Sequence, residues 1–164
     1  MQYQIGDKVF HPIHGIGKIV AIKEKALNGD IPSLYYEVAL SNSRMWVLVH
    51  PPEEGRLRHI TPKSEMARYY SLLKSRPVPL ENNYRQRQND LITRFKTGTL
   101  QALCEIVRDL RARKTLRVLS EFDSTLLTRA SDYLFDEWAA INEISRYEAS
   151  QDVEALLVEG QSYI

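Results

Sequence analysis

The stretch GDKVFHPIHGIGKIV at residues 6–20 constrains the fold of this chain most strongly, because a turn signal divides two short apolar runs. Pro12 fixes φ and lacks a backbone donor, so it suits a turn or the edge of a strand. Gly15 and Gly17 can adopt positive φ or let another backbone approach closely. The stretch therefore predicts two strands joined by a tight turn, with three apolar anchors: Val9, Ile16 and Ile19.

The rest of residues 3–60 also indicates β structure. Runs rich in β-branched and aromatic residues occur at 17–22, 34–40 and 45–49. Turn signals separate them, and the run PPEEG at 51–55 is expected to end the sheet. Four or five short strands at this spacing predict a small closed or half-closed barrel.

From Thr61 onward the apolar period is that of helices. Thr61 is the predicted N-cap of a first helix, with Pro62 at its first position. A second helix is expected over about 83–96, ended by Gly98, and Thr99 and Ser120 can cap the next two helices. A short last helix is expected around 153–157. The chain is thus expected to be α+β, with a β domain at 1–60 and an all-α domain at 61–164.

Charge is distributed unevenly. The whole chain has a formal net charge of +1, but the net charge is +1 over residues 1–60, +8 over 61–117 and −8 over 118–164. Solvated helix faces and a nucleic-acid contact in the basic middle segment both explain this pattern.

The motifs of common enzymes are absent from the sequence. No phosphate-binding GxxxxGK[ST] and no GxSxG is present, and the GxG at 15–17 lies between two strands. His11 and His14 lack further ligands at metal spacing, and Cys104 lies on an apolar helix face that favours packing over reactivity. We therefore expect neither an enzyme nor a cofactor nor a bound metal. Tyr35 and Tyr36 could suggest a methyl-lysine cage, but neighbouring strand residues point to opposite faces, which favours core packing.

The sequence also bears on location. No apolar run approaches the roughly 18 residues of a membrane span, and the N-terminus lacks the features of a signal peptide. A single cysteine excludes an internal disulfide framework. We expect a cytoplasmic monomer that does not bind membranes.

Three runs together carry a resemblance to a known family: residues 6–20, the strands YYEV and MWVLVHP at 35–38 and 45–51, and EIVRDL at 105–110. The chain resembles the CarD/CdnL family of bacterial transcription regulators over nearly its whole length. That resemblance implies a Tudor-like, SH3-like barrel that binds the β subunit of RNA polymerase, followed by a helical domain on promoter DNA. In the family, an aromatic residue wedges into the minor groove at the upstream edge of the melted bubble and stabilises the open complex. The protein would then be associated with the nucleoid through RNA polymerase.

The resemblance also implies site residues. The polymerase contact falls on Lys25, Met45, Val47 and Leu48, with Lys25 and Leu48 at positions that are commonly Arg in the family. The wedge position, usually Trp, falls on Tyr84. The residues expected to contact DNA are Tyr84, Arg85, Arg87, Arg111, Arg113 and Lys114, with Arg117 close by.

Three departures from the family pattern support an alternative, the first of which is Tyr84 in place of Trp. Ser124 and Asn89 stand at positions that are often basic in the family. The alternative is a polymerase-docking interaction module whose DNA binding is weak or lost.

Overall fold

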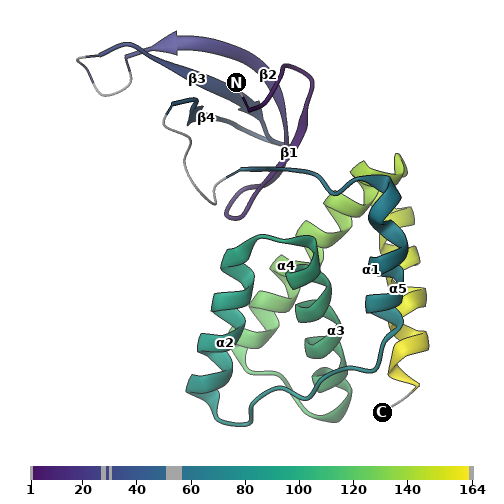
Figure 1. Ribbon diagram of the computed structural model, residues 1–164. Helices are drawn as coiled ribbons and strands as arrows, with labels where there is room; N and C mark the ends of the chain where they lie inside the picture. The colour runs from purple at the N-terminus through teal and green to yellow at the C-terminus, as the bar shows by residue number, and fades with distance from the viewer. Residues whose placement is uncertain (1, 27–28, 30, 51–56, 163–164) are drawn as a thin grey trace. The chain divides into compact units, whose positions relative to one another are not determined.

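The computed structural model describes residues 2–26, 29, 31–50 and 57–162. The chain divides into two compact units, residues 1–60 and 61–164 (Figure 1). An antiparallel sheet forms the first unit and helices form the second, which confirms the α+β class.

The sheet of the first unit has the strand order β4-β3-β2-β1-β5, and all neighbouring strands are antiparallel. The strands are β1 (Lys8–His11), β2 (Gly15–Lys25), β3 (Ser33–Ala39), β4 (Arg44–Leu48) and β5 (Arg58–His59). The expectation that PPEEG ends the sheet is wrong, because β5 follows it and pairs with β1. Residues 51–56 themselves lie outside the described part of the chain.

Gly15 and Gly17 of the opening stretch serve different purposes. Gly15 adopts a φ of 79°, which a residue with a Cβ rarely does. Gly17 allows close approach instead, because a Cβ there would lie 2.6 Å from Val38 Cγ1. Around them the core of the unit includes the buried side chains of Tyr3, Val9, Ile19, Tyr36, Val38, Val47 and Val49.

The second unit begins with a short 3-10 helix, η1 (Lys63–Glu65), that leads into α1 (Met66–Lys74). The predicted capping role of Thr61 is wrong. Pro62 occupies the N-cap of η1, and Thr61 is buried with its backbone N and Oγ1 both donating to Glu137 Oε2 at 3.1 Å. A carboxylate from helix α4 (Glu121–Asn142) thus anchors the first residue of the unit.

The remaining helices are α2 (Tyr84–Thr97), α3 (Leu100–Leu116), α4 (Glu121–Asn142) and α5 (Arg146–Gln161). Each begins behind a side-chain cap, because Asn83, Thr99, Ser120 and Ser145 accept a hydrogen bond from a backbone N three residues on. Gly98 ends α2 in the left-handed region, as predicted.

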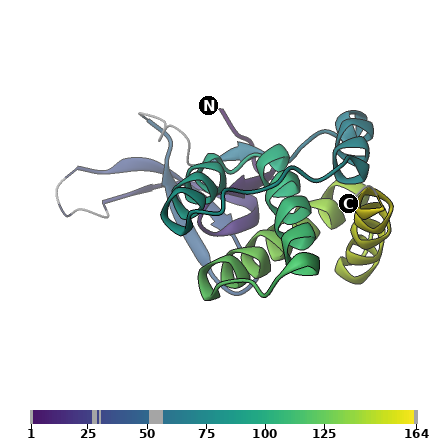
Figure 2. The same ribbon diagram turned by 90° about the horizontal axis from the view of Figure 1, so that it is seen from below.

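Helix α3 lies at the centre of the unit and packs against α1, α2 and α4. Both views show α1 beside α5 (Figures 1 and 2). The close approach at the end of α5 needs Gly160, because a Cβ there would lie 2.8 Å from the carbonyl oxygen of Ser75. The buried helical core contains Leu73, Leu91, Leu103, Ile106, Leu110, Leu134, Trp138 and Leu157. Cys104 is fully buried among these helices, as its apolar face predicted.

Candidate protein and nucleic-acid interfaces

Strand β4 is an edge of the described sheet, so its outer backbone groups face no other described strand. Its side chains alternate between two faces. Met45 pairs with Val38 and Val47 with Tyr36, and both lie on the core face. The side chains of these two predicted contact residues therefore pack inward. A partner at the edge of the sheet would meet their backbone groups instead.

The opposite face of β4 carries Trp46 and Leu48, paired with Glu37 and Tyr35 of β3. The Nζ of Lys25 lies 3.5 Å from the centroid of the Trp46 ring, a cation–π contact. Lys25 and Leu48, both predicted contacts, thus share one face with Trp46. Trp46 was not among the predicted contacts, although strand alternation places its side chain on the same face as that of Leu48 and on the opposite face from that of Met45.

Charges on this face are ordered around one carboxylate. Glu37 is buried, and its Oε1 accepts from Arg44 Nη1 at 3.0 Å, while Lys23 Nζ lies 3.8 Å from its Oε2. Arg44 lies on β4 with Trp46, and the Nζ of Lys23 lies 6.0 Å from the centroid of the Trp46 ring, so the face presents an aromatic ring among positive groups. Such a surface suits a partner segment with apolar and acidic side chains.

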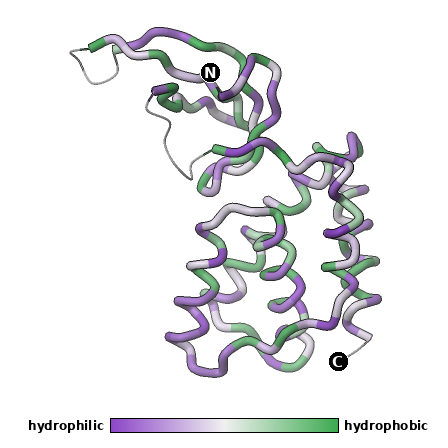
Figure 3. The backbone as a smooth tube through the Cα atoms, in the orientation of Figure 1, coloured by the Kyte–Doolittle hydropathy of each residue, from purple (hydrophilic) through white to green (hydrophobic). Residues whose placement is uncertain are grey.

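In the second unit, the start of α2 displays the predicted wedge. Tyr84 is the first residue of the helix and is 51% exposed, and Arg85 beside it is exposed and makes no ion pair with a described residue. Figure 3 colours most of α2 as hydrophilic. A helix N-terminus favours anions, and Asn83 fixes this one by accepting from Gln86 N at 3.0 Å.

Arg87 lies in a different environment from the one expected for a phosphate contact. It is buried, its Nε donates to Asp123 Oδ2 at 2.8 Å, and its Nη1 donates to the carbonyl oxygens of Glu81 and Asn82. Because it is buried and makes these bonds, its guanidinium is not available to a phosphate. Arg87 therefore joins the start of α2 to the start of α4.

The cations at the end of α3 are also partly engaged. Arg111 Nη2 lies 2.6 Å from Glu154 Oε1, and Arg113 is mostly covered with its Nε 3.9 Å from Asp123 Oδ2. Lys114 is exposed and forms no ion pair within the described residues, and Arg117 is exposed with Asn82 Oδ1 as its partner at 3.4 Å. Of the predicted DNA contacts, the structure thus leaves Tyr84, Arg85 and Lys114 most accessible.

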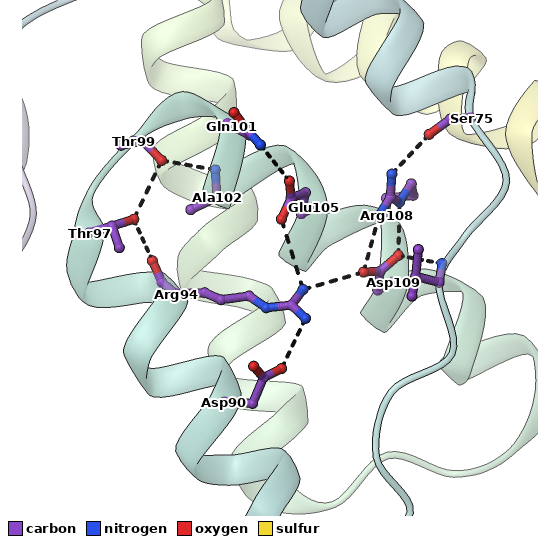
Figure 4. Close-up of polar contacts among 11 residues, drawn as sticks. Ser75, Asp90, Arg94, Thr97, Thr99, Gln101, Ala102, Glu105, Arg108 and Asp109 are labelled. Atoms are coloured by element: carbon purple, nitrogen blue, oxygen red, sulfur yellow. Dashed lines mark hydrogen bonds and ion pairs between the residues drawn. The ribbon is translucent and has the colours of Figure 1, made fainter.

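The VRDL run serves the interior of the second unit (Figure 4). Arg108 Nε donates to Asp109 Oδ1 at 2.8 Å, and Arg108 Nη1 donates to Ser75 Oγ at 2.8 Å. Asp109 Oδ1 also accepts from the backbone N of Val78, and Arg94 Nη1 lies 3.6 Å from Asp109 Oδ2. The run therefore holds the segment between α1 and α2 against α3.

The described residues contain no group of three or more side chains that could hold a metal ion. His11 instead accepts at Nδ1 from the backbone N of Ile13 and of His14. Burial, followed by the charge of Glu137, raises the pKa of the Cys104 thiol, so this residue is a poor nucleophile. No helix in the described part of the chain is both long and apolar enough to span a bilayer.

A small sheet with an aromatic edge face, followed by a helical unit with an exposed aromatic at a helix start, defines a two-part protein with a candidate interface on each unit. Two family models match the chain: the CarD-like/TRCF RID domain at residues 3–60 and the CarD C-terminal domain at residues 68–154. The chain therefore belongs to the CarD family of transcription factors. It is 28% identical over 150 residues to the "Putative transcription factor YdeB" of Bacillus subtilis (strain 168), a match that covers 87% of this chain and 94% of that protein.

Proposed function

We propose that this transcription regulator binds the β subunit of RNA polymerase through its sheet and contacts promoter DNA through its helical unit. In this proposal it stabilises the open complex at the upstream edge of the bubble without reading base sequence. The observation that carries the proposal is Tyr84, an exposed ring at a capped helix N-terminus beside Arg85.

Docking is assigned to the edge of β4 and the face with Lys25, Trp46 and Leu48. An exposed edge strand can add a strand from a partner through backbone hydrogen bonds, and the side chains of the outer face then select which partner is accepted. Met45 and Val47 contribute by holding β4 to the core. The match to the CarD-like/TRCF RID domain supports polymerase as the partner.

The DNA contact is assigned to Tyr84 with Arg85, Lys114 and Arg117. An apolar ring can occupy the unstacked step at a duplex junction, and cations nearby neutralise phosphates whatever the sequence. The helix N-terminus adds a favourable site for one phosphate. These contacts would hold the junction between duplex and melted DNA open without recognising its base sequence.

One observation favours the alternative of a docking module with weak DNA binding. Arg87, Arg111 and Arg113, three of the predicted phosphate contacts, form ion pairs within the protein. Two carboxylates, Asp123 of α4 and Glu154 of α5, thereby offset part of the +8 charge of the middle segment. Fewer accessible cations predict a shallower salt dependence of DNA binding.

Promoter-complex lifetime tests the DNA contact. Tyr84→Ala should shorten the lifetime of heparin-challenged open complexes while leaving binding to polymerase unchanged. Tyr147→Ala removes an aromatic ring from α5 that is 73% exposed, against 51% for Tyr84, and is the control. If Tyr84→Ala and the parent protein give equal lifetimes, Tyr84 is not a wedge, and a flat salt slope on forked DNA would then favour the alternative.

Retention of the β subunit tests the docking contact. Trp46→Ala should weaken binding of the full chain to polymerase about tenfold or more, because buried aromatic anchors dominate many interfaces. The same substitution should leave binding to forked DNA unchanged. Equal retention of the parent and Trp46→Ala would place the docking surface elsewhere.

A further inference from the structure

A cleft opens in the second unit between the segment that connects α1 to α2 and the last turns of α3. Its volume is about 530 Å3, which is within the range of small-ligand sites. The connecting segment runs across the end of α3 (Figure 1), and Asp109 fixes its position by accepting from Val78 N at 2.9 Å. The cleft is therefore built on a segment with a defined backbone position.

Apolar side chains form part of the wall. Val78 of the connecting segment is 52% exposed and Leu116 at the end of α3 is 66% exposed, and the smaller Ala112 also lines the cleft. Exposed apolar side chains that meet in a concave site favour a flat apolar group.

Positive charge accompanies this wall. Arg76, Arg113 and Arg117 line the cleft, and the one carboxylate in its lining, Asp109, already bonds Arg108 and Val78. The nearby Asp123 is engaged by Arg87. The lining thus carries more positive than negative charge.

The behaviour of Arg113 agrees with a surplus of cations. Burial, and after it the neighbouring Arg87 and Arg117, lowers the pKa of its guanidinium, although Asp123 acts in the opposite direction. An anion in the cleft would relieve this repulsion.

We propose that the cleft binds one nucleotide, with its base against Val78 and Leu116 and its phosphate near Arg76 and Arg117. A planar base suits an apolar wall flanked by guanidinium groups, which both stack on π faces and bind phosphate. The inference deepens the proposed function and rests on it for the source of the nucleotide, an unpaired residue of the promoter strand.

Its place in the unit supports that source. Asn82 lines the cleft, accepts from Arg117 Nη1 at 3.4 Å, and lies two residues before Tyr84. Arg87 holds the same segment through the carbonyl oxygens of Glu81 and Asn82. A DNA strand that is separated from its complement at Tyr84 would therefore lie near a cleft that can bind one of its bases.

The test uses the full chain and forked DNA with 2-aminopurine at each unpaired position in turn. Binding should change the fluorescence at one position, and Leu116→Glu should abolish that change and weaken fork binding about tenfold, the scale of one stacked base. Val158→Glu places the same charge on an exposed apolar position of α5 and should behave like the parent protein. Arg117→Gln should reduce affinity and the salt slope together.

The outcomes separate the two proposals. If the parent binds the fork but Leu116→Glu binds it equally well with the same fluorescence, the cleft proposal is overturned and the DNA contact survives. If the parent does not bind the fork, the proposed DNA function fails. Titration with free deoxyadenosine monophosphate then decides the cleft, since binding sensitive to Leu116→Glu supports it and no binding overturns it. Selective binding of a glutamate-rich, leucine-containing peptide instead of either nucleotide form would also overturn it.

Discussion

Arg87 and Asp123 form a buried ion pair in which Nε lies 2.8 Å from Oδ2, and this pair joins the start of α2 to the first turn of α4. Asp123 is on α4, so the position of Tyr84 depends on a residue 36 positions beyond Arg87. Tyr84 therefore lies on a helix whose start is fixed to α4, and not on a free loop.

Removing one partner of this pair should be costly. Arg87→Ala leaves the Asp123 carboxylate buried without its closest cation, so we expect the free energy of unfolding to fall by about 3–5 kcal/mol. Urea denaturation followed by circular dichroism measures it. Arg85→Ala is the control and should change stability by less than about 0.5 kcal/mol. A small effect of Arg87→Ala would mean that Arg113 takes over the pairing.

The cap of α2 gives a second prediction. Asn83→Ala removes the acceptor for Gln86 N and should lower the free energy of unfolding by about 1 kcal/mol. Because the frayed turn carries Tyr84, open-complex lifetime should fall as well. Asn83→Asp keeps an acceptor and should restore both properties, and failure of both to recover would argue against capping as the cause.

The thiol of Cys104 gives a third prediction. Burial raises its pKa in the folded protein, so the thiol stays neutral at pH values where an exposed cysteine ionises. Its contribution to stability is present below the unfolded pKa of about 8.5 and is lost as pH rises above that value. Labelling by a disulfide reagent at pH 8 should therefore proceed no faster than unfolding, and rapid labelling in native buffer would contradict the burial.

Close contact between α5 and the end of α1 gives a fourth prediction. Gly160→Ala places a Cβ 2.8–2.9 Å from the carbonyl oxygens of Leu73, Lys74 and Ser75. We expect a loss of about 1–3 kcal/mol, because backbone atoms cannot move aside as a side chain can. Thermal unfolding measures the loss, with Val158→Ala on the exposed side of the same helix as the control. An unchanged midpoint would show that α5 can shift away from α1.

Local rules predicted much of the second unit. Gly98, Thr99 and Ser120 end or begin helices where expected, because capping depends on residues within one turn. The same capping rule predicted Thr61 as an N-cap, but Thr61 does not cap a helix in the structure. Its backbone N and Oγ1 donate instead to the buried carboxylate of Glu137, 76 positions away. A long-range hydrogen bond of this kind leaves no periodic signal.

At the candidate interfaces, too, some residues could be selected from the sequence, whereas contacts with distant residues could not. Tyr84 and Arg85 could be selected from the sequence, and they lie exposed at a helix start. The burial of Arg87 could not, because its partners are distant carbonyls and a carboxylate of another helix. Trp46 could have been selected by counting alternate residues along β4, whereas its pairing with Lys25 depends on strand register across β3.

Asp109 holds the connecting segment through the backbone amide of Val78 and not through its side chain. The wall of the cleft can therefore change its chemistry without losing its anchor, since any residue except proline keeps that amide. Val78 is a position at which ligand preference could be altered in the laboratory, or could drift in relatives, while the backbone of the cleft stays in place.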